Sequence, residues 1–157
     1  MIEKIKQFFP GDAVLMPYQR AHGILIKPDM QQIAETKDLD GWLDRLDMQA
    51  EAGTAITWVQ NGRVVCCFGL CVIFPGVTEI WLYRQGNLMH QKRAFVVAAQ
   101  HFVRVAPPIL GAKRCQMTVD CKNVSAMRFA NWLKFETEGV LKKFGSTDLA
   151  ICARLYE

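Results

Sequence analysis

The dipeptide Asn61–Gly62, set between two runs of β-forming residues, constrains the fold of this chain more than any other feature. Residues 54–60 precede it, and the long apolar run 63–74 follows it. A type I′ turn needs positive φ angles at both central residues, which Asn and Gly adopt readily, so the pattern predicts a β-hairpin. Pro75–Gly76 then predicts a second turn, into a strand at 77–83. Three consecutive antiparallel strands are therefore expected in the middle of the chain.

The segment before this hairpin carries weaker signals. Met1–Tyr18 is interpreted as a short amphipathic turn followed by an irregular lead-in, and the short apolar run 22–27 predicts a first strand. A helix is expected over 30–36. A second helix is expected over 40–53, because leucines recur there at helical spacing and a glycine ends the pattern.

After residue 89 the period of the apolar residues becomes helical. The helix over 95–105 is expected to end at Pro107–Pro108, because proline has no N–H to continue the hydrogen-bond ladder. The alternating segment 114–120 predicts a strand. The remaining expected elements are a helix that opens after Asn123 or Ser125 and closing strands at 135–140 and 149–156.

This order of elements predicts an α/β fold with a mixed sheet and helices packed on both of its faces. A chain of 157 residues favours one domain, so residues 1–157 are expected to form a single domain with a lead-in at 1–20. No run approaches the ~18 apolar residues of a membrane span, and the N-terminus has no signal-peptide core. The sequence therefore predicts a cytoplasmic protein without a membrane partner.

Charge is distributed unevenly along the chain. Residues 1–80 carry 7 Lys and Arg against 10 Asp and Glu, whereas residues 81–157 carry 12 against 5. A basic half attracts the phosphates of a nucleotide cofactor or of a nucleic acid, and an ordinary solvated surface is the equal alternative. The 6 cysteines form no C-x-x-C pair and mostly lie in apolar runs, which favours reduced core thiols over a zinc or redox site.

The order of elements and the last quarter of the chain resemble the GNAT superfamily of N-acetyltransferases, over roughly residues 21–157. Members of that family often carry Asn, two residues, Ala, a helix with Tyr near its middle, then Gly-Phe and an acidic residue. Trp81–Leu82 and Arg93–Ala94–Phe95 also resemble a divergent GNAT-like group of tailed bacteriophages, some of which are internal virion proteins. The positions that match the family pattern are Asn123, Ala126, Leu133, Phe135 and Glu136.

The resemblance implies a mostly antiparallel central sheet and a site for acetyl-CoA, whose pyrophosphate is held by backbone N–H groups at a helix N-terminus. The family's loop there is spelled Gln or Arg, two residues, Gly, one residue, Gly or Ala. When this loop is aligned from Arg84, its one glycine, Gly86, is out of register. Leu88 and Met89 occupy positions where the family uses glycine so that the backbone can approach the phosphates closely. The positions that the resemblance assigns to the cofactor are Leu82, Arg84, Gln85, Gly86, Asn87, Lys92, Arg93 and Asn123.

For catalysis, the resemblance points to Glu79 as the base that accepts the amine proton, with a solvated strand carboxylate as the alternative. The family's general-acid tyrosine falls on Ala130, which leaves Cys121 as a substitute proton donor. Asn123 either bonds the pantetheine arm or caps the helix that follows it. Lys134 replaces the glycine before the family Phe, a change expected to reshape the helix end.

Three functions follow from these patterns. The first is transfer of acetyl from acetyl-CoA to a primary amine by direct attack, since no Ser or Cys triad pattern is visible. The second is a catalytically inactive GNAT-fold bacteriophage protein, with a role in the virion or bound to a host protein. The third, a nucleic-acid-binding module that uses the basic half, ranks last because neither a motif nor interleaved exposed aromatics support it.

Overall fold

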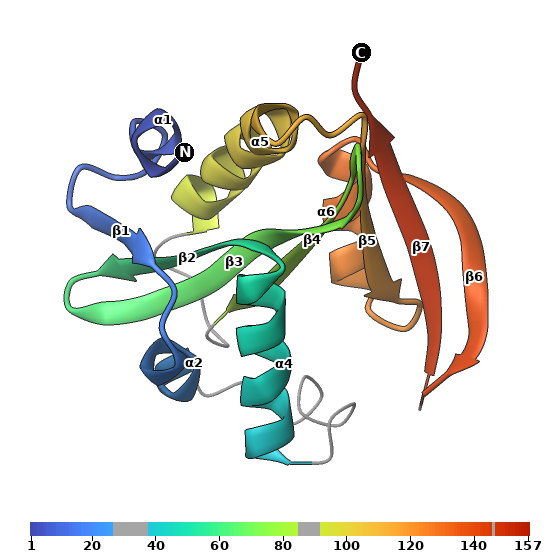
Figure 1. The fold of residues 1–157 in the computed structure, drawn as a ribbon, viewed down its shortest axis with the longest axis horizontal. Coiled ribbons are helices and arrows are strands. Elements are labelled where there is room, and N and C mark those ends of the chain that lie inside the picture. The colour runs from blue at the N-terminus through green and yellow to red at the C-terminus, as the bar shows by residue number, and fades with distance from the viewer. Residues whose placement is uncertain (27–37, 85–91, 146) are drawn as a thin grey trace.

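The computed structural model describes residues 1–26, 38–84, 92–145 and 147–157. These residues include one seven-stranded sheet in the order β1-β2-β3-β4-β5-β7-β6 (Figure 1). β4 and β5 run parallel, and the other neighbouring strands run antiparallel. The strands are β1 (Ala13–Pro17), β2 (Gly53–Gln60), β3 (Arg63–Phe74), β4 (Val77–Arg84), β5 (Arg114–Asp120), β6 (Glu136–Phe144) and β7 (Thr147–Leu155).

Helices cover both faces of the sheet, as the sequence predicts (Figure 1). α2 and α4 lie on one face, and α1, α5 and α6 lie on the other. Within the described residues, no helix combines the length and the apolar character that a membrane crossing requires. The described helices are α1 (Ile2–Lys6), α2 (Arg20–Ile26), α4 (Leu39–Glu51), α5 (Lys92–Ile109) and α6 (Val124–Trp132).

Each face of the sheet has its own apolar cluster. On the α4 side, Trp42 and Leu46 pack with Trp81 of β4. On the α5 side, Phe102 packs edge-on against Phe68 of β3, with ring centroids 4.9 Å apart. Burial of large side chains of this kind contributes about 1.5–3 kcal/mol each, so the two clusters fix the helices to the sheet.

The predicted hairpin is confirmed. Asn61 and Gly62 have φ angles of 51° and 70°, and Gln60 pairs with Arg63 across the turn. Gly76 has a φ of 81° at the next turn, between β3 and β4. Local turn chemistry therefore determines the antiparallel order of β2, β3 and β4.

The predictions for the N-terminal part are partly wrong. The run 22–27 does not form a strand, because its described residues belong to α2, where Gly23 and Ile26 are buried while Ile24 and Leu25 are 52% and 55% exposed. That spacing of buried positions is helical, and packing on α4 overrides the β propensity of the run. The lead-in is not irregular either, since it contains α1 and the edge strand β1.

The helix expected over 40–53 is confirmed as α4. Its N-terminus is capped by Asp38, whose carboxylate accepts a hydrogen bond from the backbone N–H of Gly41 at 2.7 Å. The helix expected over 30–36 lies outside the described residues.

α5 runs through Pro107 and Pro108, so the expectation that they end the helix is wrong. Pro107 has no N–H to give to the carbonyl of Val103, four residues earlier. The hydroxyl of Tyr156, at the end of β7, donates to that carbonyl at 2.5 Å instead. Burial raises the pKa of Tyr156, so the hydroxyl keeps the proton that this bond requires. A tertiary contact thus replaces the missing helical bond.

α6 ends in a Schellman motif centred on Lys134, which has a φ of 67°. The N–H of Lys134 donates to Asn131, and the N–H of Phe135 donates to Ala130 at 3.0 Å. Lys134 therefore adopts the left-handed conformation that glycine adopts more easily.

Replacing Lys134 with glycine is expected to raise the free energy of unfolding by about 1 kcal/mol, because the left-handed conformation strains a residue that has a Cβ. Urea denaturation followed by circular dichroism measures the change. The matched control is Lys134→Ala, which removes the long side chain but keeps the Cβ and should not show the gain. Equal stabilisation by both variants would contradict the strain.

Candidate functional site

The parallel strands β4 and β5 separate partway along their length and form a fork. They pair only from Val77 to Glu79 on β4 and from Arg114 to Gln116 on β5. Beyond that point β4 continues to Arg84 against β3, and β5 continues against β7. Within the described residues, the strand pairing between β4 and β5 therefore ends at Glu79 and Gln116, and the two strands diverge beyond that point.

Glu79 lies at the base of this fork, on the face of the sheet that carries α4. It is half-buried and stands between Cys71 of β3 and Gln116 of β5 in the strand register. Burial raises the pKa of Cys71 and Cys115 to about 11, and the Glu79 carboxylate adds to both shifts. Both thiols are therefore protonated at neutral pH.

The structure does not bring Cys121 to Glu79. Cys121 follows the last residue of β5, five positions beyond Gln116, which corresponds to roughly 16 Å along a strand. It is half-buried and packs against the cluster on the α5 side. Glu79 and Cys121 therefore do not form an acid–base pair around one small acyl group.

Two of the other predicted positions have structural roles. The side-chain oxygen of Asn123 accepts a hydrogen bond from the N–H of Ala126 at 3.0 Å, so Asn123 caps α6. Leu82 is half-buried and packs in the cluster on the α5 side of β4. Ala130, at the position of the family tyrosine, is 2% exposed and faces the same cluster. The described helix α6 contains one hydroxyl group, that of Ser125 in its first turn.

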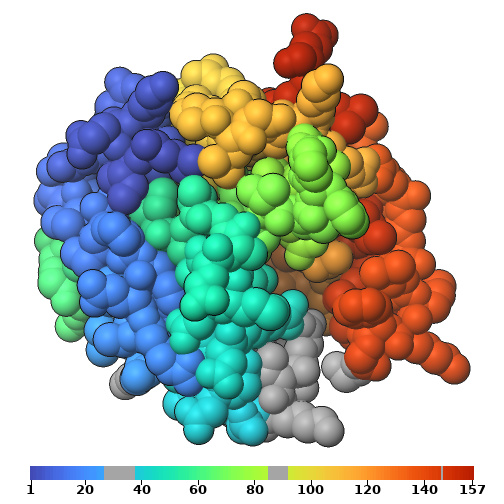
Figure 2. All heavy atoms as spheres, viewed as in Figure 1, coloured from blue at the N-terminus to red at the C-terminus, as the bar shows by residue number. Residues whose placement is uncertain are grey.

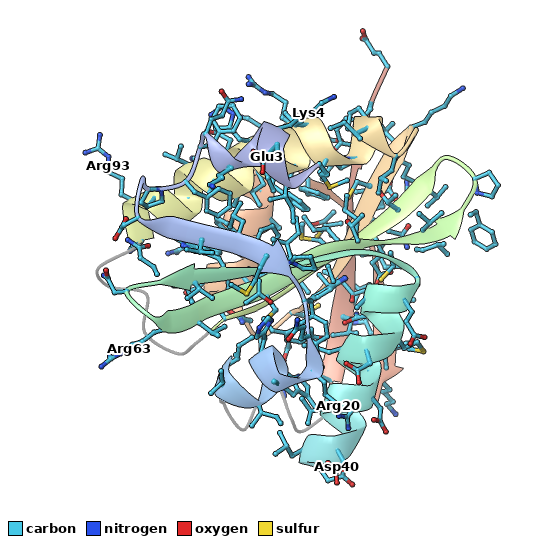
Figure 3. All side chains as sticks on the ribbon, turned by 60° about the vertical axis from the view of Figure 1, so that its left-hand side comes forward. Glu3, Lys4, Arg20, Asp40, Arg63 and Arg93 are labelled. Carbon is cyan, nitrogen blue, oxygen red and sulfur yellow. The ribbon has the colours of Figure 1, made fainter. Side chains whose placement is uncertain are left out.

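Basic side chains mark the start of α5. Lys92 and Arg93 are exposed in its first turn, which contains no acidic residue (Figure 3). Arg84, exposed at the end of β4, precedes the predicted cofactor loop. Cations are unfavourable at a helix N-terminus unless an anion offsets them. The predicted positions Gln85, Gly86, Asn87, Leu88 and Met89 lie outside the described residues.

The helices α5 and α6 meet through aromatic rings. Phe95 of α5 stacks on Phe129 of α6 with ring centroids 5.6 Å apart, and Phe129 stacks on Trp132 at 6.2 Å. The spacing of apolar residues within each helix does not indicate that α5 and α6 contact each other, because β5 separates them in the sequence.

A cavity of about 490 Å³ lies on the side of α6 that faces β6, away from the fork. Met127, Arg128 and Asn131 of α6 line one wall of it, and Glu136 and Thr137 line the other. It contains none of the predicted site residues. All six cysteines are free thiols, and the described residues contain no group of His, Cys, Asp and Glu side chains suited to a metal ion.

No protein-family model matches the chain, and no curated protein matches its sequence. Solved structures do match its fold. An N-acetyltransferase from Staphylococcus aureus Mu50 has a TM-score of 0.69 at 16% identity, over 92% of this chain and 99% of that one. A probable acetyltransferase of the GNAT family from Chromobacterium violaceum has a TM-score of 0.69 at 16% identity, over 94% and 90%. YncA from Salmonella typhimurium, solved with acetyl-CoA, has a TM-score of 0.67 at 12% identity, over 94% and 95%. At these identities the likeness establishes the fold, which is the GNAT acyl-CoA N-acyltransferase fold.

Proposed function

We propose that this chain, with its GNAT fold, binds acetyl-CoA at the fork between β4 and β5 and transfers the acetyl group to a primary amine. The observation that carries the proposal is the fork itself, since the pairing of β4 with β5 ends directly beside the half-buried side chain of Glu79. Solved relatives in fold include an enzyme with acetyl-CoA bound, which supports the choice of ligand.

The described residues fit acetyl-CoA in two respects. Past Glu79, β5 no longer pairs with β4, and backbone groups at this divergence would match the amides of a pantetheine arm. Lys92 and Arg93 place positive charge at the first turn of α5, where a pyrophosphate would also meet the positive end of the helix dipole. When bound, acetyl-CoA supplies an activated thioester.

Glu79 would act as the general base. Its carboxylate accepts the proton that the acceptor amine loses as the nitrogen attacks, and its half-buried position limits competition from water. The protein supplies no tyrosine at Ala130 to protonate the departing thiolate. A thiol has a pKa of about 8.5, so the thiolate is a stable leaving group and can take its proton from water.

The second candidate is a catalytically inactive protein with a role in a bacteriophage virion or bound to a host protein. Two observations favour it over a competent enzyme. Ala130 is buried and carries no proton donor, and the rings of Phe95 and Phe129 join α5 to α6. In this alternative the fork between β4 and β5 is a feature of the fold without a ligand-binding role, and acetyl-CoA does not bind.

Thermal and urea denaturation with and without acetyl-CoA separates the two candidates. A ligand at 100 times its dissociation constant is expected to stabilise the protein by about 2.7 kcal/mol. The double variant Lys92→Glu with Arg93→Glu should weaken that protection, whereas Arg63→Glu, at the β2–β3 turn, should not (Figure 3). Absence of any stabilisation at millimolar acetyl-CoA would eliminate the transferase proposal.

A further inference from the structure

Glu79 and Gln116 lie side by side at the base of the fork. They form the last register pair of β4 and β5, so their backbones are about 4.8 Å apart and their side chains leave the same face of the sheet. Both side chains are half-buried. A carboxylate accepts hydrogen bonds, and a primary amide both donates and accepts them. One small ligand can therefore reach a hydrogen-bond acceptor and a donor at this point.

Arg114 determines which end of the Gln116 amide faces a ligand. Its Nε donates to Gln116 Oε1 at 3.2 Å, and its two terminal nitrogens donate to Glu138 at 2.9 and 2.5 Å. With the oxygen of Gln116 engaged, its NH₂ group is left as a donor without a partner among the described residues. Glu138 forms an ion pair with Arg114 and balances its charge.

This pair lies on the face of the sheet that carries α2 and α4. Among the residues that the structure describes, α2 and α4 make their main contacts with β2 and β3 rather than with β5. Figure 2 shows the surface recessed between α4 and the β6–β7 hairpin. An acceptor molecule can approach Glu79 and Gln116 from that side, while the fork holds the acyl donor.

We propose that the acceptor is an α-amino amide, such as the N-terminus of a peptide, rather than a simple alkylamine. Glu79 accepts a hydrogen bond from the amine, and the NH₂ group of Gln116 donates to the carbonyl oxygen one carbon away. A free amino acid is disfavoured, because its carboxylate would face Glu79 while the cation of Arg114 is already neutralised by Glu138. This inference rests on the proposed function, which makes the amine at Glu79 an acetyl acceptor.

The test compares alaninamide with isopropylamine, which differ only in the carbamoyl group. Protein-observed NMR titration without acetyl-CoA should show about tenfold tighter binding of alaninamide, the effect of one hydrogen bond to a desolvated group. Gln116→Leu, of similar size, should reduce alaninamide to the affinity of isopropylamine. Thr118→Ala, one step further along the same face of β5, should retain the preference. Equal affinity of the two amines for the native protein would overturn the proposal.

A second substitution at Gln116 keeps the proposal testable if Gln116→Leu does not fold. Should Gln116→Leu prove unfolded by circular dichroism, Gln116→Glu keeps the size of the side chain and the contact with Arg114 but removes the donor. It should abolish the preference for alaninamide, and a preference that survives would refute the role of Gln116. The two proposals fail separately, because acetyl-CoA protection tests the transferase and the alaninamide titration tests the acceptor. Acetyl-CoA binding without the alaninamide preference refutes only the acceptor class.

Discussion

Replacing Glu79 with glutamine is expected to lower the rate of acetyl transfer by about 10²–10⁴-fold, the usual contribution of a positioned general base. Glutamine has nearly the same shape as glutamate and cannot accept the proton of the amine. The measurement is release of free CoA thiol from acetyl-CoA, at saturating acetyl-CoA and with alaninamide as the acceptor. The effect should fall on kcat, because the proton moves only as the nitrogen attacks.

Stabilisation by acetyl-CoA is the control for this variant. Glu79 lies on the α4 face and is not needed to hold the phosphates at α5, so the protection against unfolding should be the same in Glu79→Gln and in the native protein. A Glu79→Gln variant that retains the native rate would show that Glu79 is not the base. Glu79 would then be a solvated carboxylate on the strand, the alternative that the sequence left open.

Replacing Gly69 with alanine is expected to destabilise the fold by about 3 kcal/mol or more, and to prevent folding if the chain is marginally stable. A Cβ at Gly69 would lie 2.0 Å from the carbonyl oxygen of Thr54 on β2 and 2.8 Å from the ring of Trp81 on β4. The first of these is a backbone atom in a paired strand, so β2 and β3 would have to separate. Urea denaturation or the yield of soluble protein measures the loss.

Gly139 provides the matched control for this substitution. It also lies in a strand, β6, but a Cβ there would meet no atom within 4 Å. Gly139→Ala should therefore change the free energy of unfolding by no more than about 0.5 kcal/mol. If Gly69→Ala is equally mild, the close approach of Trp81 to β3 is wrong.

Gly69 also shows a limit of the sequence analysis. The apolar run 63–74 predicts a strand even though it contains Gly69, and the strand is present as β3. Nothing in the run indicates that Trp81 lies against this residue, because that contact depends on the register between β3 and β4. The sequence predicts the element and leaves the packing open.

The candidate site was predictable in part from the family resemblance. It placed Glu79 on the strand before the cofactor loop, and Glu79 lies on β4. It did not find Gln116, because the pairing of β4 with β5 joins residues separated by the whole of α5. It also gave Asn123 two roles, and the hydrogen bond to Ala126 shows that it caps α6.

The amino-acid sequence by itself determined much of the local structure: the type I′ turn at Asn61–Gly62, the helix α4 and the order of strands and helices from β2 onward. These depend on backbone conformation and on the spacing of apolar residues within a few positions. The tertiary structure alone decided that 20–26 is a helix, that α5 passes through Pro107 with the help of Tyr156, and that Glu79 meets Gln116. Each of these depends on a contact between distant parts of the chain, whose packing energy exceeds the local preference of the residues involved.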